Sequence, residues 1–377
     1  MEDSPQPFLS TNIARLFELA DRFLLFLARK PLYAVFFTIF LTLGLYGFGS
    51  NPAQDYFNMA GNPFQPYSRA PHFQDSLLLP LSAHWLGLAN SQAAFELYTA
   101  IAFLLAFFAI FYFARRDLRE AALFGALTLA LSPASLTCLL WLGLPDQFIV
   151  LFSAILAFAV WPPALFVVTF LGVANHPLFL FVSLTLAGLR FFSGQKEFNW
   201  RQILSILLGA FSGYISVQAF LSFYQIQIGV TRLGLMFQHD IIDWFLVKAI
   251  EAPLSIFSLY NGLWFVLAAC VLYGFPRRKA YYSVFLIVQF GAAVITFFTY
   301  DTTRIFSLLT IGAVIHCVVF TYQLAVQNRH EIIFRRLMIV LFLAAIFLPH
   351  YLVWAGDLLY PRTYKLPGLL VNLLWGR

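Results

Sequence analysis

One polar stretch in an otherwise apolar chain holds the residue types that could do chemistry. Ser50 to Trp85 lies between two long apolar runs and contains carboxylates, histidines, an arginine and several aromatic residues. Its first acid, Asp55, follows the first apolar run by about one helical turn, so we expect its carboxylate at the edge of a bilayer. A partly desolvated carboxylate can act as a general base. The alternative is a loop aspartate that caps a short helix.

The same stretch contains residues that could bind a substrate. Tyr56 follows the candidate base directly, and Arg69, His72 and Asp75 come later in the stretch. The guanidinium of Arg69 could hold a phosphate, and Asp75 could pair with it. An ordinary ion pair within the loop is the alternative for these side chains.

A second polar group lies in a short turn between two fully apolar runs. Asp301 and Arg304 are about one helical turn apart there, and Arg304 begins the second run. The start of a helix with an arginine beside it is a favourable place for a phosphate. The alternative is an anchor at the membrane boundary in which Arg304 pairs with Asp301.

A third polar group suggests a metal. His239 and Asp240, followed by Asp243, could ligate a divalent cation, although the polar face of a surface helix explains them equally well. The three cysteines fall inside apolar runs and form no metal-binding pair. A divalent metal is therefore the one cofactor that the sequence suggests, and no residue pattern in the sequence requires a cofactor.

The composition places all these residues in a membrane protein. Of 377 residues, 61% are hydrophobic and 11% are charged, whereas about a quarter of the residues in a soluble globular protein are charged. The formal net charge is +6. We interpret this charge as basic cytoplasmic flanks of membrane helices, and we expect membrane lipids, but no nucleic acid, among the partners.

The order of apolar runs predicts an all-α, polytopic membrane protein with about eleven membrane-spanning helices, and residues 1–377 as one transmembrane domain. Residues 1–30 show the spacing of an amphipathic helix that lies on the inner surface. Two outer loops with helices of their own are expected, the catalytic one over 50–94 and another over 224–252. The predicted spans are 31–48, 95–113, 121–143, 147–160, 164–174, 178–192, 202–223, 253–275, 281–299, 305–326 and 337–348.

The segment 161–192 allows two interpretations, because Asn175-His176-Pro177 interrupts its apolar run. It forms either one broken crossing or two short ones. A single crossing would put the basic residues that follow it, among them Arg277, Arg335 and Arg336, on the outside, against the positive-inside bias. We therefore predict two crossings, which leaves most of the 23 Lys and Arg residues inside.

The first polar loop resembles that of a known superfamily. An acidic residue in a long outer loop directly after the first of about eleven spans resembles the membrane glycosyltransferases of the GT-C fold. The residues Asp55-Tyr56-Phe57 to Asn62-Pro63-Phe64, then Arg69 and Leu77 to Leu81, are similar to the first-loop pattern of its bacterial members. The Asp-x-Asp metal motif is not present in the sequence, and Gln74-Asp75 stands where an arginine is usual.

The resemblance implies a donor sugar linked to polyprenyl phosphate. It also implies that Asp55 is the catalytic acidic residue, that Arg304 holds the lipid phosphate, and that the site faces the periplasm from a bacterial inner (plasma) membrane. The acceptor would be a glycan, a lipid or a protein.

The sequence-based hypothesis is therefore an inverting glycosyltransferase. Asp55 would remove the proton of the acceptor hydroxyl, and Arg304 or Arg69 would stabilise the leaving phosphate. A transporter or flippase of a lipid-linked substrate is one alternative, and it would need polar groups or unwound helices within the membrane. An outer-face polysaccharide polymerase or ligase is another, and a non-enzymatic assembly partner is a third.

Overall fold

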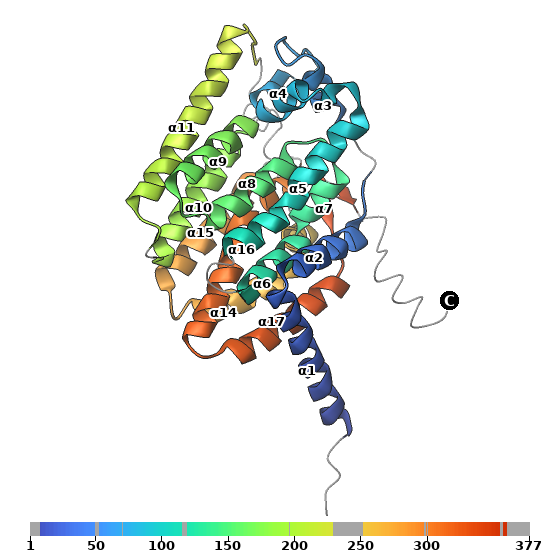
Figure 1. Cartoon of the computed structure of the whole chain (residues 1–377), viewed down its shortest axis with the longest axis vertical. Coiled ribbons are helices and arrows are strands. Elements are labelled where there is room, and N and C mark those ends of the chain that lie inside the picture. Colours follow the sequence, from blue (N-terminus) through green and yellow to red (C-terminus); the bar gives the residue numbers. More distant parts are fainter. Residues whose placement is uncertain are drawn as a thin grey trace, which may run out of the picture.

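The computed structural model describes residues 8–49, 53–69, 71–114, 119–195, 197–228, 252–297, 299, 301–354 and 357–359. Most of these residues belong to helices that pack side by side in one bundle (Figure 1). The only strands in the described ranges are β1 (Leu352–Trp354) and β2 (Asp357–Leu359), an antiparallel pair with Val353 opposite Leu358.

The helices begin and end close to the polar and proline residues that punctuate the sequence. The longer ones are α1 (Phe8–Arg29), α2 (Pro31–Tyr46), α5 (Gln92–Ala114), α6 (Arg119–Ala130), α7 (Pro133–Leu140), α8 (Asp146–Phe158), α9 (Pro162–Asn175), α10 (Phe179–Ser193), α11 (Trp200–Phe223), α14 (Leu263–Gly274), α15 (Lys279–Phe297), α16 (Thr302–Gln327) and α17 (Glu331–Phe347). The first polar loop forms α3 (Gln54–Gly61), η1 (Pro71–Asp75), α4 (Leu78–Trp85) and η2 (Leu88–Asn90).

Several of these helices are long and apolar enough to cross a membrane. Four of them, α5, α11, α15 and α16, meet both conditions alone, and the number rises to 7 if each bent pair of helices is one span. The prediction of an all-α protein with several membrane helices is confirmed at this level. The count of about eleven spans stays a prediction, because α8, α9 and α10 are apolar but shorter.

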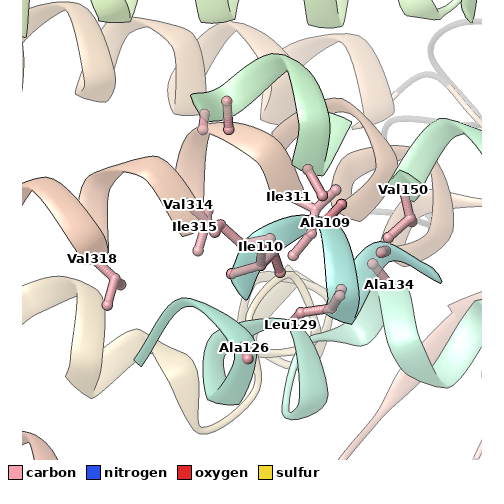
Figure 2. Close-up of a cluster of buried hydrophobic side chains, with 14 of the residues drawn as sticks. Ala109, Ile110, Ala126, Leu129, Ala134, Val150, Ile311, Val314, Ile315 and Val318 are labelled. Atoms are coloured by element: carbon pink, nitrogen blue, oxygen red, sulfur yellow. The ribbon is translucent and has the colours of Figure 1, made fainter. Parts of the chain in front are cut away.

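Helix α16 is the centre of the bundle. Of its most apolar 18-residue stretch, 94% is buried inside the protein, as expected for a helix that is apolar on every side. Its residues Ile311, Val314, Ile315 and Val318 face small and branched side chains from the helices around it (Figure 2), namely Ala109 and Ile110 of α5, Ala126 and Leu129 of α6, Ala134 of α7 and Val150 of α8. Small residues permit the close helix packing that stabilises a bundle in lipid.

Two glycines bring α11 against α9. A Cβ added at Gly209 would lie 2.5 Å from the carbonyl oxygen of Phe166, and one added at Gly213 would lie 2.7 Å from that of Phe170. These contacts with backbone atoms leave no room for a side chain, and the four-residue spacing is the small-xxx-small pattern of membrane helices. The end of α11 is thereby placed beside the first polar loop.

Hydrogen bonds define the two ends of the bundle. Arg304, near the start of α16, bonds to Asp146, the first residue of α8, so both helices start at the same end. The first polar loop joins this end through Ala53, whose N–H donates to the carbonyl of Leu142. We call this end the Asp55 face. The opposite end is the Arg335 face, where Arg335 of α17 pairs with acids of α1 and α6.

Helices α9 and α10 run in opposite directions between these two faces. At the end of α9, Asn175 Nδ2 donates to the carbonyl of Pro145, which precedes α8 at the Asp55 face. Near the end of α10, Arg190 Nη1 donates to the carbonyls of Leu156 and Ala159 at the other end of α8, at 2.7 and 2.6 Å. Two crossings over 161–192 would have this antiparallel arrangement, and the number of crossings stays a prediction.

Candidate active site on the Asp55 face

A buried glutamine shapes the loop that carries Asp55. Gln74 is 6% exposed, and its side-chain oxygen accepts from the N–H of Tyr67 at 2.8 Å. Its amide nitrogen donates to the carbonyl of Gln65, also at 2.8 Å. These bonds fold the segment after α3 back over that helix. Tyr67 and Arg69 therefore lie next to Asp55, which comes more than ten positions earlier in the chain.

Asp55 is the residue on which these side chains converge. The hydroxyl of Tyr67 donates to Asp55 Oδ1 at 2.8 Å, and Arg69 Nε lies 3.5 Å from the same oxygen. The Asp55 side chain is 29% exposed, and that of Arg69 is 72% exposed. Among the described residues, no hydrogen bond engages Asp55 Oδ2, so this oxygen can accept one from a ligand.

The helix-capping alternative for Asp55 has no support in this geometry. The N-cap of α3 is Ala53, and no side chain caps the helix. Asp55 instead lies in the first turn, where the helix dipole favours a carboxylate. Its bonds go to side chains of the same loop, so Asp55 is held in place without being neutralised by a buried cation.

Tyr67 was not among the residues that the sequence singled out. Burial raises the pKa of its hydroxyl, and the neighbouring Asp55 carboxylate raises it further, while Asn58 and Arg69 lower it. Tyr67 therefore stays protonated near neutral pH and remains a hydrogen-bond donor. Its contact depends on how Gln74 folds the loop, for which a single sequence contains no spacing signal.

The other predicted residues of this loop contact its residues Phe73 and Ser76. Tyr56 is 2% exposed and stacks on Phe73, with ring centroids 5.1 Å apart. The ring of His72 also packs against Phe73, with ring centroids 4.4 Å apart. Asp75 accepts from Ser76 Oγ at 3.4 Å. The carboxylate that lies 3.5 Å from Arg69 is that of Asp55, whereas the suggested pair of Arg69 with Asp75 is not seen among the described residues.

Arg304 is enclosed by two carboxylates. Its Nε and Nη2 donate to both oxygens of Asp146, at 2.5 and 3.0 Å, and its Nη1 donates to Asp301 Oδ2 at 2.8 Å. The Asp146 side chain is 1% exposed, and that of Arg304 is 17% exposed. Asp146 begins α8, whose dipole favours a carboxylate there, and the planar fork of Arg304 matches it with two bonds. Asp146 was not among the residues that the sequence singled out.

These bonds bear on the predicted role of Arg304. The guanidinium nitrogens of Arg304 are already bonded to the carboxylates of Asp146 and Asp301, so a phosphate would have to compete with both acids for them. The geometry therefore favours the anchor alternative, in which Arg304 joins the starts of α8 and α16. Arg69 is the better-placed cation for an anionic ligand, because it is exposed and its single ion pair with Asp55 is long.

A small apolar pocket of about 10 Å³ borders the loop. It is lined by Met59 and Pro63 from α3 and the turn after it, by Leu77 and Pro80 at α4, by Phe220 and Ile226 at the end of α11, and by Gln74. Met59 lies one helical turn after Asp55, and Gln74 bonds to the backbone of Tyr67. The pocket thus lies next to the loop that carries Asp55, between α3, α4 and the end of α11.

The structure gives no direct sign of a metal in its described part. In those ranges, no three His, Cys, Asp or Glu side chains are grouped so that they could hold a metal ion. His239 and Asp240, the predicted ligands, lie outside the described residues.

Comparisons with protein-family models, curated proteins and solved structures found no match to this chain. The fold and site therefore define a class: a helical membrane protein with an aspartate-centred polar site at one end of its bundle.

Proposed function

We propose that this protein is a membrane glycosyltransferase that moves a sugar from a polyprenyl-phosphate-linked donor to an acceptor hydroxyl, with the Asp55 face on the outside. One observation carries the proposal. Asp55, Tyr67 and Arg69 meet at one end of the bundle, beside a small apolar pocket. This cluster suits the charged, hydrogen-bonding head of a lipid-linked ligand.

The reaction assigns a separate task to each side chain. The acceptor oxygen attacks the anomeric carbon of the sugar while the bond from that carbon to the phosphate oxygen breaks. Asp55 Oδ2 takes the acceptor proton as general base. Tyr67 holds Oδ1 and fixes the direction of the carboxylate. Arg69 moves from Asp55 to the phosphate, where it stabilises the negative charge that develops on the leaving group. Attack from the side opposite the phosphate inverts the anomeric carbon.

Arg69 offers a test of the leaving-group assignment. We expect Arg69→Ala to lower kcat/KM for sugar transfer about 10- to 100-fold, because a charge-assisted hydrogen bond to the phosphate is lost. Arg69→Lys should recover part of the loss if a point charge is sufficient. The measurement is transfer from a synthetic prenyl-phosphate sugar by the reconstituted protein.

The matched control is Arg329→Ala, which removes an exposed arginine from the opposite face of the bundle. It should leave transfer unchanged. If Arg69→Ala and Arg329→Ala have equal effects, Arg69 does not contact the phosphate and the assignment is wrong.

Orientation can be tested with a membrane-impermeant thiol reagent. The native cysteines Cys138, Cys270 and Cys317 are buried, so the parent should give little background. We expect Ser68→Cys, exposed on the Asp55 face, to react in intact cells, and Asn328→Cys, exposed on the Arg335 face, to react only after permeabilisation. The reverse pattern would place the site in the cytoplasm and remove the proposed donor side.

A second candidate function, transport of a lipid-linked substrate, is favoured by one observation. Asn175 and Gln147 are fully buried at the two helix breaks near the Asp55 face. The side-chain oxygen of each makes no hydrogen bond within the described residues. Polar groups at broken helices are typical of transporters. Movement of a prenyl-phosphate sugar across the vesicle membrane without any acceptor would favour transport. Consumption of the donor only when an acceptor is present would favour the transferase.

A further inference from the structure

Helix α1 has an exposed side on which cations and large apolar residues are sorted. Arg15, Arg22 and Arg29 are exposed and seven positions apart, so they form one row along the helix. Leu19, Phe23 and Phe26 are 62%, 47% and 49% exposed, and their spacing of four and three positions forms a second row beside the first.

The other side of α1 is locked to the bundle by ion pairs. Asp21 is 8% exposed, and it accepts from Arg335 Nε at 2.9 Å and from Arg336 Nε at 3.1 Å. Arg335 also donates to Glu120 of α6 at 3.3 Å. These bonds prevent α1 from rolling about its axis. The row of arginines and the apolar row therefore stay on the outside of the protein.

The direction of α1 places these rows at the boundary of a membrane. Helix α1 turns by 114° from α2, whose sequence is almost entirely apolar. If α2 runs through the bilayer, α1 lies close to its surface on the Arg335 face. In Figure 1, α1 extends outward from the body of the bundle. Other exposed cations surround this face, including Arg277, Arg278 and Arg329, so its field attracts anions.

We propose that the outer side of α1 is a binding surface for acidic phospholipids of the adjacent leaflet. The arginine row contacts the headgroup phosphates while Leu19, Phe23 and Phe26 enter the start of the acyl region. The apolar row selects a lipid over a soluble phosphate, because only a lipid supplies hydrocarbon next to the anionic group. This inference does not depend on the function proposed for the Asp55 face.

The test uses purified full-length protein equilibrated with equal amounts of phosphatidylglycerol and phosphatidylcholine, and native mass spectrometry counts the lipids that stay bound. We expect the parent to retain phosphatidylglycerol preferentially. Each arginine near a membrane surface changes binding about fivefold. The combined variant Arg15→Gln, Arg22→Gln, Arg29→Gln should therefore lose the preference.

The control removes three charges from the same face but not from α1, through Arg277→Gln, Arg278→Gln and Arg329→Gln. It should keep the preference, and an equal loss in the control would show that only the overall field of the face matters. A parent without preference would overturn the proposal directly.

A variant that is expected to bind more lipid adds a test whose positive result misfolding cannot explain. Glu18 is exposed and pairs with Arg22 at 2.6 Å, so it competes with a headgroup for that arginine. Glu18→Gln should raise the retention of phosphatidylglycerol severalfold and leave that of phosphatidylcholine unchanged. No change in Glu18→Gln would contradict binding through the arginine row.

Discussion

Asp55→Asn is expected to lower the rate of sugar transfer about 10²- to 10⁴-fold, the usual contribution of a general base. The amide keeps the size of the carboxylate and can still accept from the Tyr67 hydroxyl through its oxygen. It cannot take a proton from the acceptor. Because the site is partly exposed and caps no helix, we expect expression, membrane insertion and melting temperature close to those of the parent.

Asp75→Asn is the matched control for Asp55. It makes the same change, from carboxylate to amide, at another aspartate of the same loop, in η1. We expect Asp75→Asn to retain most of the transfer activity, measured with the reconstituted protein and a prenyl-phosphate sugar. A near-parental rate for Asp55→Asn would mean that Asp55 only shapes the loop, and the glycosyltransferase proposal would lose its base.

The largest effect on stability is expected at Arg304. Arg304→Met removes the cation between Asp146 and Asp301 and leaves Asp146, 1% exposed, as an uncompensated buried charge. Breaking a buried ion pair in this way costs about 3–5 kcal/mol. We expect a correspondingly lower melting temperature in detergent, because the bonds that join the starts of α8 and α16 are lost.

The double variant Arg304→Met, Asp146→Leu separates this explanation from a general packing defect. It removes the buried charge together with its partner, so part of the lost stability should return. If the double variant is as unstable as the sum of the two single variants, the charges do not interact and the anchor interpretation of Arg304 fails. Transfer activity near the parental level in a folded Arg304 variant would also exclude Arg304 as the main phosphate ligand.

The fold was predictable where local chemistry determines it. Proline marks the starts of α2, α7 and α9, because proline fits the first turn of a helix. The close packing of α9 with α11 was not predicted. It depends on Gly209 and Gly213 meeting a backbone from another part of the chain, which residue periodicity within one helix cannot reveal.

The site was predictable to a similar degree. Asp55 and Arg69 emerged from the sequence because charged residues are rare in this chain and these two lie in one loop. Tyr67 did not, since its contact with Asp55 follows from the fold of the loop around Gln74. Asp146 did not either, because its partner Arg304 lies 158 positions later. Whether Arg304 was an anchor or a phosphate ligand could be weighed only after both of its carboxylate partners were known.

The contact of Arg190 with the end of α8 has a consequence for how the chain is assembled during synthesis. An arginine in an isolated membrane helix costs up to about 2.5–3.5 kcal/mol at the helix centre and less near the helix end, where Arg190 lies. In the folded protein, its Nη1 is held by the carbonyls of Leu156 and Ala159, which come from a helix synthesised earlier. If α8 crosses the membrane, as the sequence predicts, these acceptors are already in the bilayer when α10 emerges from the ribosome. Biogenesis of this region should therefore proceed with α8, α9 and α10 as one cooperative insertion unit rather than as three independent helices.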